Sequence, residues 1–509
     1  MNVNPITRLD YPDPDVIRVE DTYYMVSTTM HFMPGCEILQ SFDLVHWEHV
    51  TYVYETLDHT DAQQLKSGQN IYGQGMWAAS LRYHEGRFYI CFVANDTRKT
   101  YLYTSEKIDG PWKKQLIEGF YHDGSLLFDE DGRNYIVYGN DEIWITELNE
   151  DLTAPKKDGL HRLLVSDHKN PELGYEGSHI QKINGYYYIF LIHSLRDRWM
   201  RTEACFYSDS LEGEFTGGDV LCDDRGYCGQ GVAQGGIVDT PDGKWYAMLF
   251  QDSGAVGRIP ILLPVTWKDH FPFFGQNGHV PEEIEVHSTR PGYIYQPLVG
   301  SDDFCNGLLP RWQFNHDPDP RYYHLDALQG TYTITTREVC TELTQAVNTL
   351  TQRMSYPSCA AEVTVDASAL KEGDVAGLCA LQGCYAAVGI TKHHGKYEVL
   401  MLDKKEDGIL DMTEGTVVES HQMDFRLEAD FCNMKDEARC YYRVNKGDWL
   451  PIGTVHKLYF KLDHFTGCRF GLFCYAAEET GGSACFRDFK YYDCLLYTSP
   501  SPRDLSTSR

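Results

Sequence analysis

DPDVIRVEDTYYMVSTT, at residues 13–29, is the first of five segments in this chain that share one design. The others are WAASLRYHEGRFYICFVAN (77–95), DGSLLFDEDGRNYIVYGN (123–140), EGSHIQKINGYYYIFLIHS (176–194) and QGGIVDTPDGKWYAMLFQD (234–252). Each begins with a short apolar strand, passes through a polar turn and continues into an aromatic-rich strand. The segments begin 46 to 64 residues apart, which leaves room for a four-stranded sheet in every repeat.

The turn residue keeps one place in all five segments, eight positions after the first: Asp21, Glu85, Asp131, Asn184 and Asp242. In four of the five a Gly follows it, which favours a two-residue hairpin. Tandem units of this kind are typical of a five-bladed β-propeller. Hairpins stacked in an open sandwich would also alternate, but they would not keep a constant offset. We therefore predict an all-β chain with a propeller over residues 1–299.

The repeat also predicts which side chains meet. The innermost strands of a propeller line one central channel, so equivalent positions in different blades converge on one axis. The first position of the repeat holds Asp13, Trp77, Asp123, Glu176 and Gln234. Carboxylates that are crowded together away from water cost free energy through desolvation and repulsion. The ring of three carboxylates, one indole and one amide therefore predicts a functional site.

Such a ring suits the hydrolysis of a glycosidic bond. One carboxylate activates water while a second, held protonated, donates a proton to the leaving oxygen. A third can raise the pKa of the acid and orient it. An indole offers a flat apolar face to a sugar ring. The chain contains no phosphate loop, dinucleotide fingerprint or Ser-His-Asp arrangement that would compete with this interpretation.

Three stretches resemble the catalytic signatures of glycoside hydrolase family 43: YPDPDVIR, HDGSLLFDEDG and YEGSHIQKINGYYYIF. That family has a five-bladed propeller with inverting chemistry. The resemblance implies that Asp13 is the general base, Asp123 the pKa modulator and Glu176 the general acid. Asp15 stands where the family often has Ser. Strand alternation places Asp15 on the same face as Asp13, so the sequence leaves Asp15 open as an alternative base.

The same resemblance extends to substrate contacts. WAAS is similar to a Trp-Ala-Pro segment of the family and implies Trp77 as a sugar platform. GRIPILLPVTW is similar to a segment whose Arg binds sugar hydroxyls, which implies Arg258. The loop HFMPGCEI is similar to one that shapes the sugar subsite, so Phe32 and Met33 are candidate walls, with ordinary loop packing as the alternative.

A calcium ion is a further expectation from the resemblance. Many relatives hold one on the propeller axis, with a His before the Gly of the fifth repeat. This chain has Gln234 there, in VAQGG, and a Gln carbonyl oxygen can also bind calcium. We expect a structural or activating calcium at Gln234 and no cofactor that the chemistry itself requires.

From about residue 300 a new alternating pattern begins, through AGLCALQGCYAAVGI, KYEVLML and RFGLFCYAAEETGGSACFRDFKYY. It predicts a β-sandwich over residues 300–493, similar to the concanavalin-like domain of xylosidase-type members of the family. We expect this domain to shape or close the pocket. Residues 494–509, rich in Ser and Pro, are interpreted as a disordered extension or a cloning or sequencing scar.

The sequence therefore predicts an inverting, exo-acting β-xylosidase or α-L-arabinofuranosidase that acts on xylan- or arabinoxylan-derived oligosaccharides. An endo-arabinanase, a retaining invertase-type propeller and a noncatalytic sugar-binding propeller remain alternatives. The net charge of −29 disfavours a nucleic-acid partner, and no apolar run predicts a membrane span. We expect a cytoplasmic protein because no secretory signal is present in the given chain. A homo-oligomer remains open.

Overall fold

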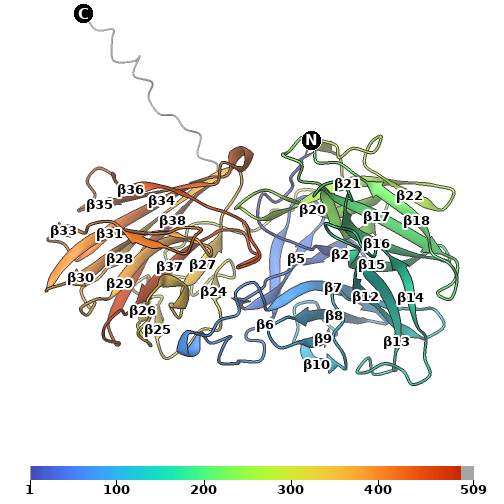
Figure 1. The fold of residues 1–509 in the computed structure, drawn as a ribbon, viewed down its shortest axis with the longest axis horizontal. Coiled ribbons are helices and arrows are strands. Elements are labelled where there is room, and N and C mark those ends of the chain that lie inside the picture. The colour runs from blue at the N-terminus through green and yellow to red at the C-terminus, as the bar shows by residue number, and fades with distance from the viewer. Residues whose placement is uncertain (1, 494–509) are drawn as a thin grey trace, which may run out of the picture.

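The computed structural model describes residues 2–493 and consists of two β domains side by side (Figure 1). The N-terminal domain contains five antiparallel four-stranded sheets, and the C-terminal domain two larger ones. The predicted tail, 494–509, lies outside the described residues. Within the described residues, no helix is long and apolar enough to cross a membrane.

Each predicted repeat forms the two inner strands of one sheet, so the five sheets are the blades of a propeller. Blade 1 contains β2 (Asp15–Val19), β3 (Thr22–Val26), β5 (Gly35–Ser41) and β6 (Glu48–Tyr54). Blade 2 contains β7 (Met76–His84), β8 (Arg87–Ala94), β9 (Lys99–Ser105) and β10 (Lys113–Ile117). Blade 3 contains β11 (Ser125–Phe128), β12 (Asn134–Asn140), β13 (Glu142–Leu148) and β14 (His161–Ser166).

Blade 4 contains β15 (Glu176–Ile183), β16 (Tyr186–Ser194), β17 (Arg201–Ser208) and β18 (Thr216–Leu221). Blade 5 contains β19 (Val232–Asp239), β20 (Trp245–Asp252), β21 (Arg258–Lys268) and β22 (Phe271–Phe274). The inner strand of each blade contacts the inner strand of the next, and β19 contacts β2, so the ring closes. A small sheet of β1 (Asn2–Val3) and β23 (Glu283–Ile284) lies outside the blades.

The hairpin turn between the two inner strands has the predicted length of two residues in only some of the blades. Blades 1, 2 and 4 turn in two residues, and in blade 4 both Asn184 and Gly185 have positive φ, at 51° and 85°, as this tight turn requires. Blades 3 and 5 instead use five-residue loops, 129–133 and 240–244. The two-residue prediction was wrong there because the Asp-Gly pair lies inside a longer loop.

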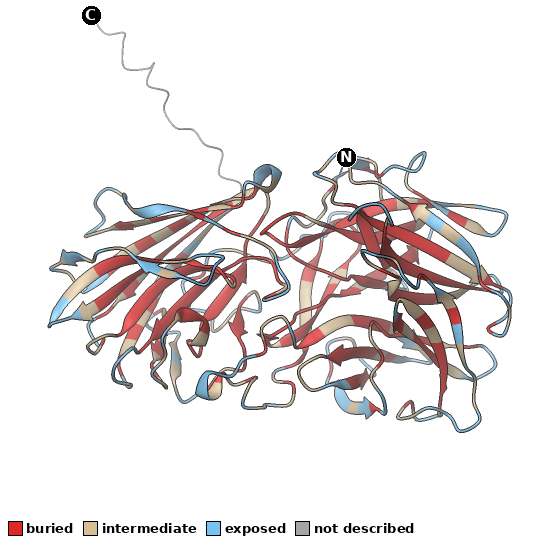
Figure 2. Cartoon of the chain, in the orientation of Figure 1, coloured by how far each residue is buried: buried red, intermediate tan, exposed pale blue. Residues whose placement is uncertain are grey.

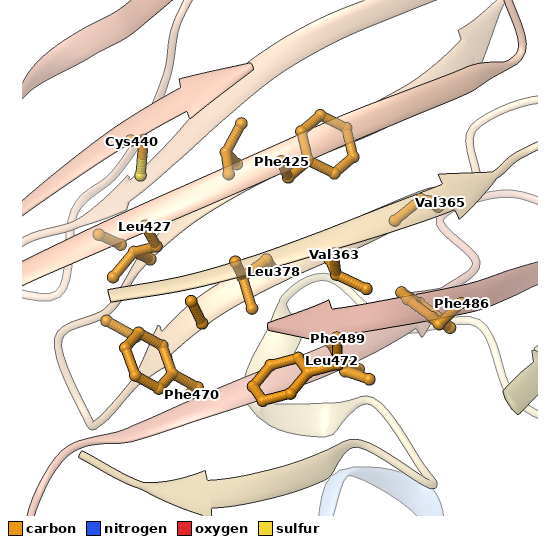
Figure 3. Close-up of a cluster of buried hydrophobic side chains, with 14 of the residues drawn as sticks. Val363, Val365, Leu378, Phe425, Leu427, Cys440, Phe470, Leu472, Phe486 and Phe489 are labelled. Atoms are coloured by element: carbon orange, nitrogen blue, oxygen red, sulfur yellow. The ribbon is translucent and has the colours of Figure 1, made fainter. Parts of the chain in front are cut away.

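The C-terminal domain is a sandwich of two sheets. One sheet is ordered β32 (Leu410–Met412), β31 (Lys396–Lys404), β30 (Ala386–His393), β29 (Val375–Leu381), β37 (Arg469–Tyr475), β27 (Leu350–Arg353), β24 (Gln313–Asn315) and β4 (Phe32–Met33), with β33 (Thr416–Val418) paired to β31. The other is ordered β25 (Tyr323–Asp326), β26 (Thr331–Thr335), β38 (Ser483–Asp493), β28 (Ser358–Asp366), β34 (Gln422–Asp430), β35 (Glu437–Arg443) and β36 (Leu450–Lys457). Alternating strand residues such as Val363, Phe425 and Leu472 fill the space between the sheets (Figure 3).

The two domains are joined by strand pairing and by a buried ion pair. β4 comes from the propeller half of the chain yet pairs with β24, which makes it an edge strand of the sandwich. Arg353 Nη1 lies 2.9 Å from Glu37 Oε2, and both side chains are buried. The strands on either side of this junction are largely buried (Figure 2). The contact fixes the sandwich beside the propeller mouth, where its loops reach the site described next.

Candidate active site

All five residues at the first position of the repeat line one pocket of about 640 Å³. Three of those positions have strained backbone: φ is 52° at Asp13, 48° at Asp123 and 59° at Gln234. Left-handed conformations cost free energy for residues other than Gly and gather at functional sites. The pairing of inner strands also shifts register next to Trp77, Glu176 and Gln234, as bulges do where a strand redirects a side chain.

Asp13 is buried and oriented by two donors. Its Oδ1 accepts a hydrogen bond from Arg258 Nη1 at 3.0 Å, and its Oδ2 accepts one from Thr28 Oγ1 at 2.6 Å. Arg258 itself is buried and stacks its guanidinium 4.2 Å from the centre of the Phe465 ring. Asp13 and Arg258 therefore form one fixed unit in the pocket wall.

Asp15, the alternative base, lies elsewhere. Its side chain is fully buried, and its Oδ2 accepts hydrogen bonds from Leu81 N at 2.7 Å and Arg82 Nη1 at 2.8 Å. Its Oδ1 lies 3.2 Å from His179 Nδ1. Burial opposes ionisation of Asp15, but Arg82, His179 and the Leu81 N–H donor together outweigh burial and lower the pKa of Asp15. Asp15 belongs to a structural network of the inner strands rather than to the pocket lining.

Asp123 and Glu176 lie close together on neighbouring blades. Asp123 Oδ2 accepts a hydrogen bond from Gly177 N at 3.0 Å. Burial raises the pKa of Asp123 to about 6, with His122 opposing the rise and Glu176 and Asp13 adding to it. Glu176 is partly exposed, and its Oε2 accepts a hydrogen bond from Asn140 Nδ2 at 2.6 Å. The two neighbouring carboxyl groups therefore lie in different environments, since Glu176 is partly solvated and Asp123 is desolvated.

Trp77 and residues of the sandwich form an aromatic wall. The Trp77 ring lies 5.4 Å from that of Phe465, which comes from the sandwich loop before β37. That loop also contributes Phe460, Lys461 and Leu462 to the pocket, and the loop before β35 contributes Met434. The sandwich therefore shapes the pocket directly. The sequence pattern of that domain carries no signal for these individual residues.

Phe32 and Met33 are not on the pocket wall. Both side chains are buried, because β4 pairs with β24 of the sandwich. Phe32 packs in a sandwich cluster and lies under the guanidinium of Arg469, 3.5 Å from its ring centre. Met33 packs between blades 1 and 2. The structure supports the ordinary-packing alternative, since an apolar pair in a loop can face a neighbouring domain as readily as a ligand.

Two pocket residues escaped the sequence analysis although a signal for each was present. His122 directly precedes Asp123 in the quoted HDGSLLFDEDG. Arg201 opens the third strand of blade 4 as Arg258 opens that of blade 5, and the two guanidinium groups lie 5.1 Å and 5.4 Å from the Phe250 ring centre. Arg201 Nη1 lies 2.7 Å from Asp252 Oδ2. This pair offers donors and acceptors to sugar hydroxyls.

Gln234 is buried on the axis, and its backbone N–H donates to Glu203 Oε2 at 2.7 Å. Calcium takes about six to eight oxygen ligands. The cavity beside Gln234 measures about 10 Å³, and both oxygens of nearby Asp13 already accept hydrogen bonds. These side chains do not by themselves complete a calcium shell. Gln234 would supply one amide oxygen, but a cavity of about 10 Å³ has room for about one water molecule rather than for the remaining ligands, so calcium stays a prediction.

One group of three potential metal ligands occurs in the described residues: His122, Asp123 and Glu176, whose ligand atoms lie within 4.8 Å of one another. Two of the three are the candidate modulator and acid. We interpret the group as catalytic and assign no metal to it.

Comparison with known proteins agrees with this geometry. Residues 3–272 match the model of glycosyl hydrolases family 43, and residues 301–492 match the beta-xylosidase C-terminal concanavalin A-like domain. The chain belongs to glycosyl hydrolase family 43. This family 43 protein is therefore a glycoside hydrolase with a propeller and a concanavalin-like domain, as the sequence predicted.

Curated relatives of this family 43 protein carry xylosidase and arabinosidase names. A "Beta-xylosidase" of Formosa agariphila is 27% identical over 94% of this chain and 88% of the relative. A "Xylosidase/arabinosidase 43B" of Humicola insolens is 26% identical over 98% of both chains. Among solved structures, the "Bifunctional GH43-CE" of Bacteroides eggerthii has a TM-score of 0.91 and 42% identity over 97% of this chain. The present chain spans 64% of that protein.

Proposed function

We propose that this glycoside hydrolase is an inverting, exo-acting β-xylosidase or α-L-arabinofuranosidase. Its substrates would be short oligosaccharides derived from xylan or arabinoxylan. The names of the relatives support the substrate class. The observation that carries the exo mode is the wall that the sandwich builds over the propeller mouth with Met434, Phe460, Leu462 and Phe465. A pocket walled on two sides by different domains favours a chain end over the middle of a polymer.

In this mechanism Asp13 is the general base. It takes a proton from a water molecule whose oxygen attacks the anomeric carbon from the face opposite the leaving group. The bond from the anomeric carbon to the glycosidic oxygen breaks, and Glu176 donates its proton to that oxygen. Asp13 ends protonated and Glu176 ionised, so proton exchange with solvent restores both. The pair of donors on Asp13 supports this role, because it fixes the carboxylate in one orientation.

The remaining residues bind and orient. Asp123 is the modulator, since its charge lies beside Glu176 and favours the protonated acid. Trp77 and Phe465 supply apolar faces for the sugar ring, and Arg258 binds a hydroxyl while it holds Asp13. Arg201 and Asp252 are added to this set as a second polar contact for the substrate.

The test is to follow hydrolysis of arabinoxylo-oligosaccharides by proton NMR and to record the sugar released and its first anomer. We expect free xylose or L-arabinose, with inverted configuration at the anomeric carbon. Retained configuration would give one carboxylate a nucleophilic role. Internal cleavage to longer products would favour the endo-arabinanase alternative, and the absence of products with measurable oligosaccharide affinity would favour a binding protein.

A further inference from the structure

His122 lies between the two carboxylates assigned to acid catalysis. Its Nε2 is 3.5 Å from Glu176 Oε2 and 3.6 Å from Asp123 Oδ2. The side chain is only 20% exposed, and the backbone is fixed because the His122 carbonyl accepts a hydrogen bond from Gly139 N at 3.0 Å. One imidazole nitrogen thus faces both members of the pair at nearly equal distance.

The charges around His122 come from several blades. Asp123 is its chain neighbour, Glu176 comes from blade 4 and Asp13 from the start of blade 1. Farther charged groups on the same pocket lining are Arg258, Arg201, Asp252 and Lys461. Asp123, followed by Glu176 and Asp13, raises the pKa of His122 to about 9 against the opposing effect of burial. The ring is therefore an imidazolium at neutral pH, and both of its nitrogens are donors.

A donor at this place limits which oxygen of Glu176 can carry the acidic proton. Oε2 already accepts from Asn140 Nδ2 at 2.6 Å, and Nε2 of His122 points a second donor at the same atom. In a protonated carboxyl group, the oxygen that accepts from two donors is the carbonyl oxygen, and the other oxygen carries the proton. The proton is therefore left to Oε1.

The second consequence concerns Asp123, which is buried beside two other carboxylates. A desolvated carboxylate among like charges tends to take up a proton, and a neutral Asp123 would no longer act on Glu176 as a charge. A cation within 4 Å opposes this tendency. The only neighbour in that position among the described ion pairs of Asp123 is His122.

We propose that His122 is a positioning residue of the catalytic centre: it keeps Asp123 ionised and holds Oε2 of Glu176, so that Oε1 presents the proton to the leaving oxygen. The inference rests on the proposed roles of Asp123 and Glu176. It also gives His122 a measurable effect on the pH range of activity, because a cation among carboxylates lowers the pKa of all of them.

The experiment compares pH profiles of kcat/KM for the wild type, His122→Asn and His122→Lys on xylobiose, whose leaving group needs the proton of the acid. Loss of the cation raises the pKa of the base and of the acid together. We expect both limbs of the bell-shaped profile to move to higher pH by about one unit in His122→Asn. His122→Lys keeps a cation and should return the profile toward the wild-type position. His161→Asn is the matched control, since His161 lies on the outer strand β14 of the same blade and stacks on Trp144.

The outcomes separate this inference from the proposed function. A wild type that does not hydrolyse glycosides would overturn the proposed function itself. A His122→Asn variant with lower activity but an unmoved profile would overturn the role of His122 while the function stands. If His122→Asn does not fold, NMR titration of the histidine ring protons in the wild type and His122→Lys decides. A ring that titrates near pH 9 in the wild type and is missing from His122→Lys supports the proposal, and its absence from the wild type refutes it.

Discussion

Arg258 Nη1 lies 3.0 Å from Oδ1 of Asp13, and this buried ion pair joins the third strand of blade 5 to the start of blade 1. The backbone next to this ion pair is also hydrogen-bonded across the two domains. Asp10 accepts hydrogen bonds from Arg258 N at 2.7 Å and from Gly467 N at 2.8 Å. The proposed base is thus oriented by a contact that also fixes the sandwich loop.

Asp13→Asn should remove the general base without removing the hydrogen-bonded shape of the site. We expect kcat to fall by at least about 10²–10⁴-fold and Tm to fall as well, because Arg258 loses its buried ion-pair partner, while the affinity for xylo-oligosaccharides stays near normal. Initial rates, thermal melts and calorimetric binding measure the three quantities.

Asp15→Asn is the matched comparison, because Asp15 is two residues away but bonded to Arg82 and His179. Removing one partner of a buried ion pair costs about 3–5 kcal/mol, so this variant should unfold more easily and yet keep its turnover per folded molecule. Normal stability with lost turnover in Asp15→Asn would transfer the base role to Asp15.

Glu176→Ala should show a strong dependence on the leaving group. Activated aryl glycosides leave without protonation, whereas natural oligosaccharides need the proton of an acid. We expect kcat/KM to fall by roughly 10²–10⁴-fold on xylobiose and by much less on a dinitrophenyl xyloside. The two substrates act as controls for one another in the same variant, and equal losses on both would contradict Glu176 as the acid.

Phe32→Ala and Phe465→Ala should separate packing from binding. Phe32 is buried against Arg469, so its truncation should cost about 3–5 kcal/mol of stability and leave KM unchanged. Phe465 contacts Trp77 and Arg258 in the pocket, so its truncation should raise KM roughly tenfold through the loss of about 1–2 kcal/mol of contacts. Urea unfolding and Michaelis–Menten kinetics of both variants check this. A raised KM in Phe32→Ala would restore Phe32 to the subsite.

The repeat was sufficient to predict the blades and the convergence of Asp13, Asp123 and Glu176, because a fixed position in a closed ring determines a place in space. The positions of loop residues cannot be predicted from the repeat in this way. Phe32 pairs with Asn315 across the domain junction, and no local pattern relates two segments so far apart in the chain. The same holds for Phe465, whose position depends on how the sandwich docks. His122 and Arg201 could have been identified from the sequence, because His122 directly precedes the first position of the third repeat and Arg201, like Arg258, begins the third strand of its blade.

Calcium chelation tests the axial site. If an ion is held at Gln234, removing it with EDTA should lower Tm and activity, and added calcium should restore both, because a ligand that binds only the folded state stabilises it. Gln234→Ala should lose the response to calcium. Unchanged Tm and activity in the EDTA-treated wild type would show that calcium neither stabilises nor activates this protein.

His122 should also make stability depend on pH. Its pKa is raised from about 6.5 to about 9 in the folded protein. A raised pKa means that the stabilisation is fully present below pH 6.5 and is lost as pH rises through 9. The difference in free energy of unfolding between wild type and His122→Asn should therefore shrink over this interval, by at most about 1.4 kcal/mol per pH unit. Urea unfolding of both proteins at about pH 6, 7.5 and 9 measures this difference in free energy of unfolding. The three pH values bracket the titration of His122. A constant difference across the series would mean that folding does not raise the pKa of His122, and it would rule out an imidazolium at neutral pH in the catalytic centre.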